Sequence, residues 1–556
     1  MHTFFSFIEN YATLHSTCAQ IVSLATLFFL YAETHYSFKG VYSRLKKKEP
    51  EIIADVPFRI EPGSVLPVLV FIKDAHLHPL FLQHVSITIK TASFQKTYQR
   101  AFNEQAINTQ FWYHIIEITP EVNLTGSVEV DVQIMVKCDK QQFVVKNDNY
   151  ACTSHLPFTV YFARQPLPKA SKWFFGDVHC HSHYTNDQVE FGAPLVACKR
   201  FAKPLGLNFF CATDHSYDLD DVTDNYLKND PQLKKWLSFH KEVSDLNNES
   251  SDFLIIPGEE VSIGNAKKAN VHLLILNHPE FIPGSGDSAE KWFRTKPTLQ
   301  IQDVLNKLNG TSVSIAAHPE LKPPFLERLF VGRGKWETPD YQYASLHSMQ
   351  VWNGSEDGLF AGIDCWKKLL LNGKRLFITG GNDAHGNFNR FRQIGFPFFT
   401  INEHHQHLFG KVRTAVYLKD DFSLNSILQA IRHGNTVITD GPFVELRVTN
   451  EHDSEAVTGE TLAGNDFLLT AKFLSTEEFG ALTEARLFLG DLQKKTERIF
   501  RTWKDFASAF EHSETLQLQN PPRSYLRVEL TTVKDRNTFR CFTNPIWLKR
   551  ESPANS

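Results

Sequence analysis

The segment 173–187, with the sequence WFFGDVHCHSHYTND, places the strongest constraint on how this chain can fold. Its apolar start is typical of a buried strand, and His179 and His181 follow, two residues apart. Residues two apart in an extended segment point to the same face, so both imidazoles can bind one metal ion from a single strand end. A His-x-His pair alone is weak evidence, because half-buried strands contain it by chance. Its interpretation therefore depends on the rest of the chain.

Four later apolar runs carry the same kinds of side chain near their ends. These runs are LNFFCATDH, FLIIPGEE, SVSIAAHPE and RLFITGGNDAHG, and the side chains are His215, Glu260, His318, and Asp383 with His385. Another strand-like run, NVHLLIL, contains His272. In a parallel α/β barrel the active site lies at the C-terminal ends of the strands, where such residues gather. The repetition therefore favours a shared site over separate structural roles.

Stretches with helical patterning separate several of these runs. They cover residues 194–205, 301–308 and 361–371, and each leads into an apolar run. Alternating strands and helices are typical of a parallel sheet. We therefore predict an α/β domain over residues 167–442.

The segments on either side have a different pattern. Residues 51–166 and 443–556 contain short runs in which apolar and polar residues alternate, as from Val128 to Val136. This period of two is typical of half-buried strands. We therefore predict a β-sandwich-like domain before the α/β domain and a β-rich domain after it. Residues 1–50 are predicted to form a separate, apolar helical segment.

Composition limits the partners and the compartment. The length of 556 residues predicts two to four domains. A net charge of -4 gives no global basic field, so there is no strong signal for nucleic acid. The eight cysteines include no C-x-x-C pair and are interpreted as reduced thiols, which favours the cytoplasm.

The apolar stretch 19–32 has two interpretations. It is shorter than the roughly 20 residues of a transmembrane helix, and no Lys or Arg precedes it as in a signal peptide. Basic residues follow it, which would hold the rest of the chain in the cytoplasm. It is either a helix packed on the protein or a peripheral membrane anchor.

Five motifs in order resemble those of a known family. They are DVHCH at 177–181, TDH at 213–215, PGEE at 257–260, AHP at 317–319 and NDAHG at 382–386. They are similar to motifs of the PHP (polymerase and histidinol phosphatase) metal-dependent phosphoesterases, in particular the carbaryl-hydrolase-like subgroup. The resemblance covers about residues 172–442. It implies a distorted (β/α)7 barrel that holds up to three metal ions, flanked here by the two predicted β domains.

The resemblance also implies which residues bind the metals. For two of the ions, it assigns His179, His181 and Asp383 to the first, His272 and His318 to the second, and Glu260 as a bridge. Such ligands suit Zn²⁺, Mn²⁺ or Fe²⁺, and the ligand types alone do not select one of these metals.

A third ion is implied at His215 and His385. Its last ligand would be Asp187 or, as the rival, His183. A similar choice exists at the bridge, where Glu259 stands beside Glu260. Residue 260 aligns better with the family's G-x-E.

The predicted chemistry uses several of these side chains. Asp383, His385 and His215 are the predicted catalytic residues among the metal ligands, and Arg390 is the candidate that would bind phosphate, with Arg392 as a second. Two metal ions roughly 3.5–4 Å apart can share a hydroxide and stabilise the charge on an attacked phosphorus.

Three other polar residues have two interpretations each. Asp177 and Asp214 either orient histidines from behind or cap the ends of strands. Asn353 ends the run MQVWN and either contacts substrate or begins a turn.

The expected function is that of a metal-dependent hydrolase, a phosphoesterase for a small-molecule or nucleotide phosphoester. Hydrolysis of a carboxyl or carbamate ester by the same metal site is the alternative within enzymes. A metal-bound scaffold that binds a partner without turnover is the alternative outside them.

Overall fold

The computed structural model describes residues 49–138, 141–149, 155–185, 192–222, 225–286, 295–308, 310–323, 328, 332–390, 393–395, 400–402, 407–519 and 521–550. The chain forms two compact units. The first comprises residues 1–166, 185–206 and 384–409, and the second comprises residues 167–184, 207–383 and 410–556. The predicted anchor at 19–32 lies outside the described residues.

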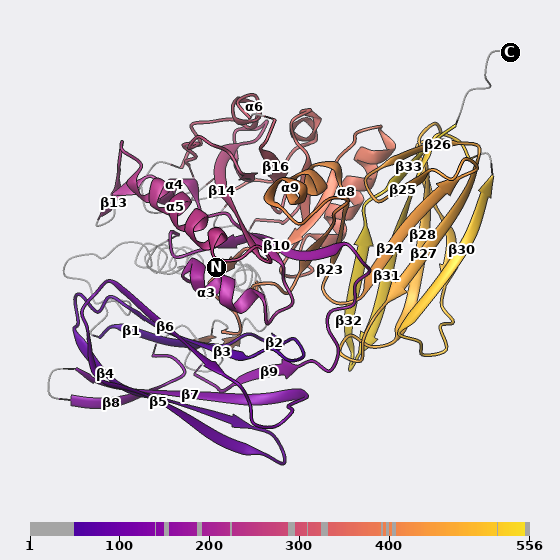
Figure 1. Cartoon of the computed structure of the whole chain (residues 1–556). Coiled ribbons are helices and arrows are strands. Elements are labelled where there is room, and N and C mark those ends of the chain that lie inside the picture. The colour runs from indigo at the N-terminus through magenta and orange to yellow at the C-terminus, as the bar shows by residue number, and fades with distance from the viewer. Residues whose placement is uncertain are drawn as a thin grey trace, which may run out of the picture. The chain divides into compact units, whose positions relative to one another are not determined.

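The first unit contains two sheets in its N-terminal part, drawn in indigo to purple in Figure 1, and their strands pair antiparallel except for β2 with β9. The smaller sheet has the order β1-β3-β6, from β1 (Glu51–Asp55), β3 (Leu66–Lys73) and β6 (Phe111–Ile118). The larger has the order β2-β9-β7-β4-β5, with β8 beside β7. Its strands are β2 (Arg59–Ile60), β4 (Leu80–Lys90), β5 (Gln95–Ile107), β7 (Gly126–Cys138), β8 (Gln141–Lys146) and β9 (Phe158–Phe162).

One apolar core lies between these two sheets. In β7, Val128, Val130, Val132, Ile134 and Val136 are buried, and the residues between them are more exposed. They pack with alternate residues of β3, such as Val68 and Val70, in the same cluster. The period of two in the sequence thus corresponds to one buried and one exposed face. The remaining elements of this unit are α3 (Leu195–Ala202), β19 (Ala384–His385), β20 (Gln393–Gly395) and β21 (Thr400–Asn402).

The second unit is built on a mixed sheet whose central order is β18-β17-β16-β15-β14-β11-β10-β22-β23. These strands are β10 (Trp173–His181), β11 (Phe209–Ala212), β14 (Leu254–Gly264), β15 (Asn270–Leu276), β16 (Val313–Ala316), β17 (Ser348–Asn353), β18 (Phe377–Gly381), β22 (Arg413–Tyr417) and β23 (Thr436–Thr439). β10, β11 and β14 run parallel, as do β16, β17 and β18.

The predicted α/β fold class, with a distorted (β/α)7 barrel, is wrong. Strand accounts for 47% of the structure and helix for only 13%, whereas a (β/α) barrel needs a helix after each strand. β15 returns directly from β14 as an antiparallel hairpin and then pairs antiparallel with β16. β22 is antiparallel to β10, and β23 continues the sheet into a C-terminal strand, β32 (Asn537–Thr543). The protein is therefore mainly β, with a mixed sheet in the second unit.

The helices of this unit are few and mostly short. They are α4 (Ser216–Leu219), α5 (Lys234–Asn248), α6 (Ile301–Leu305), the 3₁₀ helix η2 (Thr338–Gln342), α8 (Leu359–Leu371) and α9 (Leu424–His433). Two short strands, β12 (Asp221–Val222) and β13 (Asn225–Asn229), pair antiparallel. α9 begins at Ser423, whose hydroxyl accepts from the Ser426 amide, and ends at Gly434 with φ 71°. Its apolar side packs with residues of β10, β11 and β16 in one core cluster.

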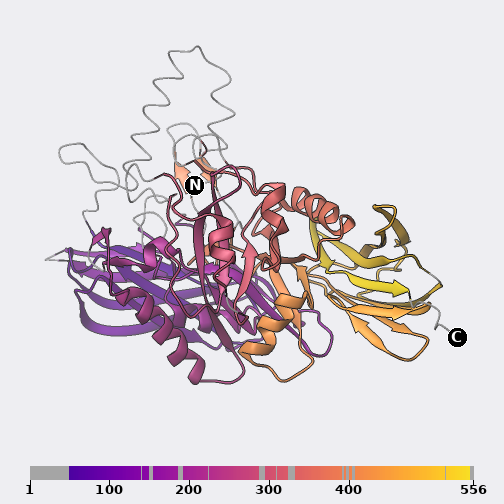
Figure 2. The same cartoon turned by 90° about the horizontal axis from the view of Figure 1, so that it is seen from above.

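The C-terminal strands form two layers in the same unit. One layer continues the central sheet through β32, β31 (Ser524–Lys534), β28 (Leu482–Asp491) and β29 (Thr496–Trp503). The other has the order β25-β24-β27-β30, from β24 (Phe443–Asn450), β25 (Glu455–Val457), β27 (Asp466–Leu474) and β30 (Glu511–Gln519). Figure 2 shows both layers in orange and yellow, and β26 (Thr461–Gly464) pairs with the last strand, β33 (Ile546–Arg550). Within the described part of the chain, no helix is both long enough and apolar enough to cross a membrane.

Candidate metal centre

The end of β10 carries the first two candidate ligands. His179 and His181 are both buried, and their Nε2 atoms lie 3.3 Å apart. The parallel register with β11 shifts between Asp177 and Cys180, so the strand is irregular where it carries the histidines. Gly381 of β18 lies against His179, because a Cβ at 381 would come within 2.9 Å of the His179 backbone nitrogen. Only a glycine allows β18 to approach β10 this closely.

Two carboxylates complete a first group of ligands with these histidines. Glu260 Oε2 lies 3.4 Å from His179 Nε2 and 3.3 Å from His181 Nε2. Asp383 Oδ1 lies 3.3 Å and 3.1 Å from the same two nitrogens. In a tetrahedral site with metal–ligand bonds of about 2.0–2.1 Å, neighbouring ligand atoms are roughly 3.3–3.4 Å apart. The spacing and the donor types of this group therefore fit a divalent metal ion.

A second group shares one residue with the first. Glu260 Oε1 lies 2.6 Å from His272 Nδ1 and 3.2 Å from His318 Nε2. His272 comes from β15, and His318 follows β16. The two oxygens of Glu260 thus face different groups of candidate ligands, Oε2 the first and Oε1 the second. The structure brings together all six residues that the sequence assigned to the first two ions.

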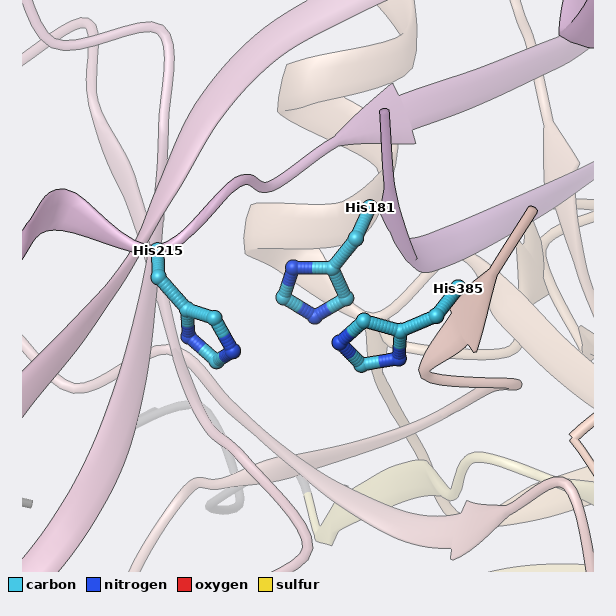
Figure 3. A group of neighbouring side chains, drawn as sticks. All are labelled: His181, His215 and His385. Carbon is cyan, nitrogen blue, oxygen red and sulfur yellow. The ribbon is translucent and has the colours of Figure 1, made fainter. Parts of the chain in front are cut away.

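Of the residues assigned to a third ion, His215 belongs to the second unit and His385 to the first. His215 lies at the start of α4, with Nδ1 3.1 Å from Glu260 Oε2 and its ring centroid 4.4 Å from that of His181. Figure 3 draws these two rings together with His385, which is on β19 in the first unit. Asp187 lies outside the described residues. Its rival His183 has Nε2 3.8 Å from a carboxylate oxygen of Glu242 on α5. The third ion stays a prediction.

The charges in the centre suit metal binding. Burial alone would raise the pKa of Glu260 and Asp383, but the surrounding histidines hold both values well below the usual range, so both groups stay ionised. Burial lowers the pKa of His215 and His272, so these imidazoles stay neutral. Metal ligation requires ionised carboxylates and neutral imidazoles.

The pair on β10 differs from the other histidines. Burial opposes a charge on His181, but Asp383 and Glu260 raise its pKa to about 10. The same carboxylates raise the pKa of His179 against the effect of burial. Metal ligation requires both imidazoles to be neutral, so binding of a divalent cation by this first group would release protons.

Residues behind the ligands fix their orientation. Gln350 on β17 accepts a hydrogen bond at Oε1 from His179 Nδ1 over 2.8 Å, which leaves His179 Nε2 toward the centre. Gln350 also donates to Asn353 Oδ1 over 2.7 Å, and Asn353 donates to Asp383 Oδ2 over 3.1 Å. Asn353 therefore supports a ligand. Gln350 was not predicted from the sequence, where the available signal was a polar amide inside the run MQVWN.

Asp177 and Asp214, which the sequence left with two interpretations each, both accept hydrogen bonds from backbone amides. Asp177 accepts from the amides of His179 and Gly410 and from the side chain of Asn382, and burial raises its pKa to about 6. Asp214 accepts from the amide and the hydroxyl of Ser182, over 2.8 Å and 2.7 Å. These hydrogen bonds therefore fix the strand end.

Glu259 and Glu260 are neighbours on β14, but their side chains have different contacts. Glu259 Oε1 accepts from Trp236 Nε1 over 3.0 Å, and Oε2 accepts from the Ile282 amide over 3.4 Å. Burial raises the pKa of Glu259 to about 8, so a proton stays on this carboxyl at neutral pH. Glu260, with the five nearby imidazoles, is the carboxylate that faces both groups.

Arg390, the predicted phosphate-binding residue, is paired within the first unit. Its amide donates to Asp55 Oδ1 over 3.1 Å, its Nε lies 3.5 Å from Asp55 Oδ2, and its Nη1 lies 3.9 Å from Asp148 Oδ2. These contacts give Arg390 a role in fixing the chain around Asp55, and its catalytic role stays a prediction. Arg392 lies outside the described residues.

Comparisons with known proteins add little to this picture. No protein-family model matches the chain, and no curated protein matches it. Among solved structures, the chain is similar to a calcium-binding mutant of Bacteroides uniformis β-glucuronidase 2 (11% identity, TM-score 0.18, 92% of this chain and 62% of that chain). It is also similar to Parabacteroides merdae β-glucuronidase (10% identity, TM-score 0.16, 91% of this chain and 64% of that chain). A third similar structure is an α-2-macroglobulin fragment from Escherichia coli (9% identity, TM-score 0.16, 90% of this chain and 99% of that chain). The chain thus spans less than two thirds of either glucuronidase, and TM-scores this low define no shared fold.

Proposed function

We propose that this protein is a metal-dependent hydrolase, and specifically a phosphoesterase that works with two or three divalent ions, zinc, manganese or iron. The observation that carries the proposal is the position of Glu260. Its two oxygens lie within 3.4 Å of candidate ligands from two separate groups. A carboxylate in this position can hold two cations close together, which is the arrangement that favours attack on a phosphoester.

The metals would supply a hydroxide near neutral pH and stabilise charge on the attacked phosphorus. The chain itself supplies the ligands and their orientation. Gln350 holds the ring of His179, Asn353 holds Asp383, and burial keeps bulk water from Glu260. Such a preorganised, buried site needs little rearrangement when charge develops on a substrate.

The motif resemblance to PHP phosphoesterases supports the same reaction class independently of the fold. A small-molecule or nucleotide phosphoester is the proposed substrate, and the cytoplasm is the proposed compartment. The alternatives are hydrolysis of a carboxyl or carbamate ester at the same centre and a metal-bound scaffold without turnover.

A substrate panel with defined metal loading tests the proposal. The purified protein is stripped with a chelator, reloaded separately with Zn²⁺, Mn²⁺ and Fe²⁺, and assayed with p-nitrophenyl phosphate, bis(p-nitrophenyl) phosphate and p-nitrophenyl acetate. We expect metal-dependent hydrolysis of a phosphate ester, with two or more metals per chain by mass spectrometry. Turnover of the acetate alone would support the carboxyl ester alternative, and tight metal binding without any turnover would support the scaffold.

A further inference from the structure

Arg333 belongs to a short segment that is fixed alongside the start of β15. The Asn270 amide donates to the Gly332 carbonyl over 2.9 Å, and the Gly334 amide donates to the Asn270 carbonyl over 2.8 Å. These two bonds pair Arg333 with Asn270 in a parallel bridge. Asn270 is two residues before His272, so the backbone of Arg333 is held close to a candidate ligand.

Other contacts prevent this segment from sliding. Trp336 Nε1 donates to the His272 carbonyl over 3.2 Å, and the Asn265 side chain donates to the Lys335 carbonyl over 2.6 Å. At Gly334 a Cβ would come within 2.5 Å of the Ala269 Cβ, so the two segments are in close contact there. Arg333 is therefore held by its neighbours on both sides.

The guanidinium of Arg333 lies against the second group of ligands. Its Nη1 lies 2.7 Å from His272 Nε2, and its Nη2 lies 3.1 Å from His272 Nδ1. His272 Nδ1 is also 2.6 Å from Glu260 Oε1. With Nδ1 protonated and donating to Glu260 Oε1, the lone pair of Nε2 accepts from Arg333 Nη1, and the approach of Nη2 to Nδ1 is then a contact rather than a hydrogen bond. A permanent cation thus lies at the edge of the group formed by Glu260, His272 and His318.

Ligation of a metal by His272 is incompatible with this hydrogen bond. A neutral imidazole has one lone pair, which either accepts from Arg333 or binds a cation. With a metal on His272, Arg333 no longer donates to this ring, and its guanidinium still lies beside the centre. A guanidinium matches the oxygens of a phosphate in geometry and charge, whereas a neutral ester offers no anionic oxygen.

We propose that Arg333 binds the anionic oxygens of the substrate beside the Glu260–His272–His318 group and so selects phosphate esters over neutral esters. This inference rests on the proposed function and specifies its substrate class. Arg333 is separate from Arg390, which is paired with Asp55 in the first unit.

Two variants of Arg333 and one control test this role. Arg333→Met removes the charge but keeps an unbranched side chain, and Arg333→Lys keeps the charge without the planar fork. The control is Lys335→Met, two residues along the same segment, because the ammonium of Lys335 is 3.1 Å from Glu320 Oε2. Metal content is measured first. Binding of inorganic phosphate to the metal-loaded protein is measured by calorimetry, and kcat/KM is measured for p-nitrophenyl phosphate and p-nitrophenyl acetate.

Arg333→Met should keep its metals and lose phosphate. We expect phosphate affinity and kcat/KM for p-nitrophenyl phosphate to fall on the order of 10²-fold, the usual cost of removing one donor to developing charge, with little change for any acetate activity. Arg333→Lys should lie between wild type and Arg333→Met, and it provides the comparison if Arg333→Met does not fold. Lys335→Met should resemble wild type.

Two results would overturn the assignment. One is unchanged phosphate binding in both Arg333 variants. The other is an equal loss of metal, phosphate and acetate activity, which would make Arg333 a support for His272. A wild-type protein that binds phosphate through Arg333 but hydrolyses no phosphoester would refute the proposed function and leave the binding role of Arg333 in place.

Discussion

Glu260→Gln is the substitution that most directly tests the shared centre. It preserves the shape of the side chain and removes its negative charge. In the structure the two oxygens of Glu260 lie 2.6–3.4 Å from nitrogens of five histidines, at positions 179, 181, 215, 272 and 318. Among the candidate groups of the described residues, Glu260 belongs to both, and Asp383 of the first group has Oδ2 3.9 Å from His318 Nε2 of the second. The variant should therefore impair binding of both metals.

The expected magnitude follows from the charge that is lost. At a separation of about 4 Å and an effective dielectric constant of about 20, two unit charges interact by roughly 4 kcal/mol. Since 1.4 kcal/mol corresponds to about a tenfold change in affinity, removal of this carboxylate should weaken metal binding on the order of 10³-fold. We expect loss of at least one metal per chain and a fall in turnover on the order of 10²-fold or more.

Glu259→Gln provides the matched control on the next residue of β14. Glu259 keeps its proton at neutral pH and contacts Trp236 and Ile282 instead of the ligands, so its amide variant should retain metal and turnover. Metal content by mass spectrometry and hydrolysis rate are measured for both variants. Full metal and activity in Glu260→Gln, with loss of both in Glu259→Gln, would mean that the bridging carboxylate is residue 259. If neither change has an effect, the bridged-metal mechanism is wrong.

Three further predictions concern residues around the centre. Folding raises the pKa of Glu259 from 4.5 to about 8, so its stabilising contribution is full below pH 4.5 and is lost as the pH rises toward 8. The Tm of wild type should therefore fall relative to that of Glu259→Gln between pH 4.5 and 8, and a constant difference in Tm would contradict this prediction. Gln350→Met removes the acceptor for His179 Nδ1 and should weaken metal binding about 10–100-fold in a chelator competition, whereas Gln350→Glu should retain affinity. Asp383→Ala and Asp383→Gly should both lose metal. The glycine variant should have the higher Tm, because φ at residue 383 is 52° and a Cβ there costs about 1–2 kcal/mol. Equal melting temperatures would show that the backbone relaxes.

The sequence located most strands but not their directions. The run NVHLLIL at 270–276 is buried throughout, and a continuous apolar run is compatible with a parallel or an antiparallel strand. Its direction is set by the turn before it, where Asn265 Oδ1 accepts from the amides of Lys267 and Ala269. This turn lacks the Asn-Gly or Asp-Gly pair that most clearly predicts a hairpin. The parallel sheet that the barrel requires was therefore wrong at β15, which is antiparallel to both of its neighbours.

The candidate ligands were easier to predict than the residues that support them. Histidines and carboxylates at the ends of apolar runs are unusual enough to be noticed, and six of them converge. Gln350 and Arg333 contribute through partners distant in sequence, His179 and His272, so no local spacing identifies them. Glu260 was chosen over Glu259 from the resemblance, because a strand places neighbours on opposite faces and the pattern alone does not show which face bears the site.

The backbone at two candidate ligands supports a functional origin for the cluster. His318 and Asp383 have φ values of 28° and 52°, in a region that residues with a Cβ rarely adopt. Each lies two residues after the end of a strand that pairs parallel with β17, His318 after β16 and Asp383 after β18. The amide of Asp383 donates to the His179 carbonyl over 2.8 Å, which ties the strained turn to β10. A glycine at either position would relieve a cost of about 1–2 kcal/mol but would remove a side chain that faces Glu260 or His179. The presence of histidine and aspartate at these turns is therefore explained by what their side chains contact rather than by stability of the sheet.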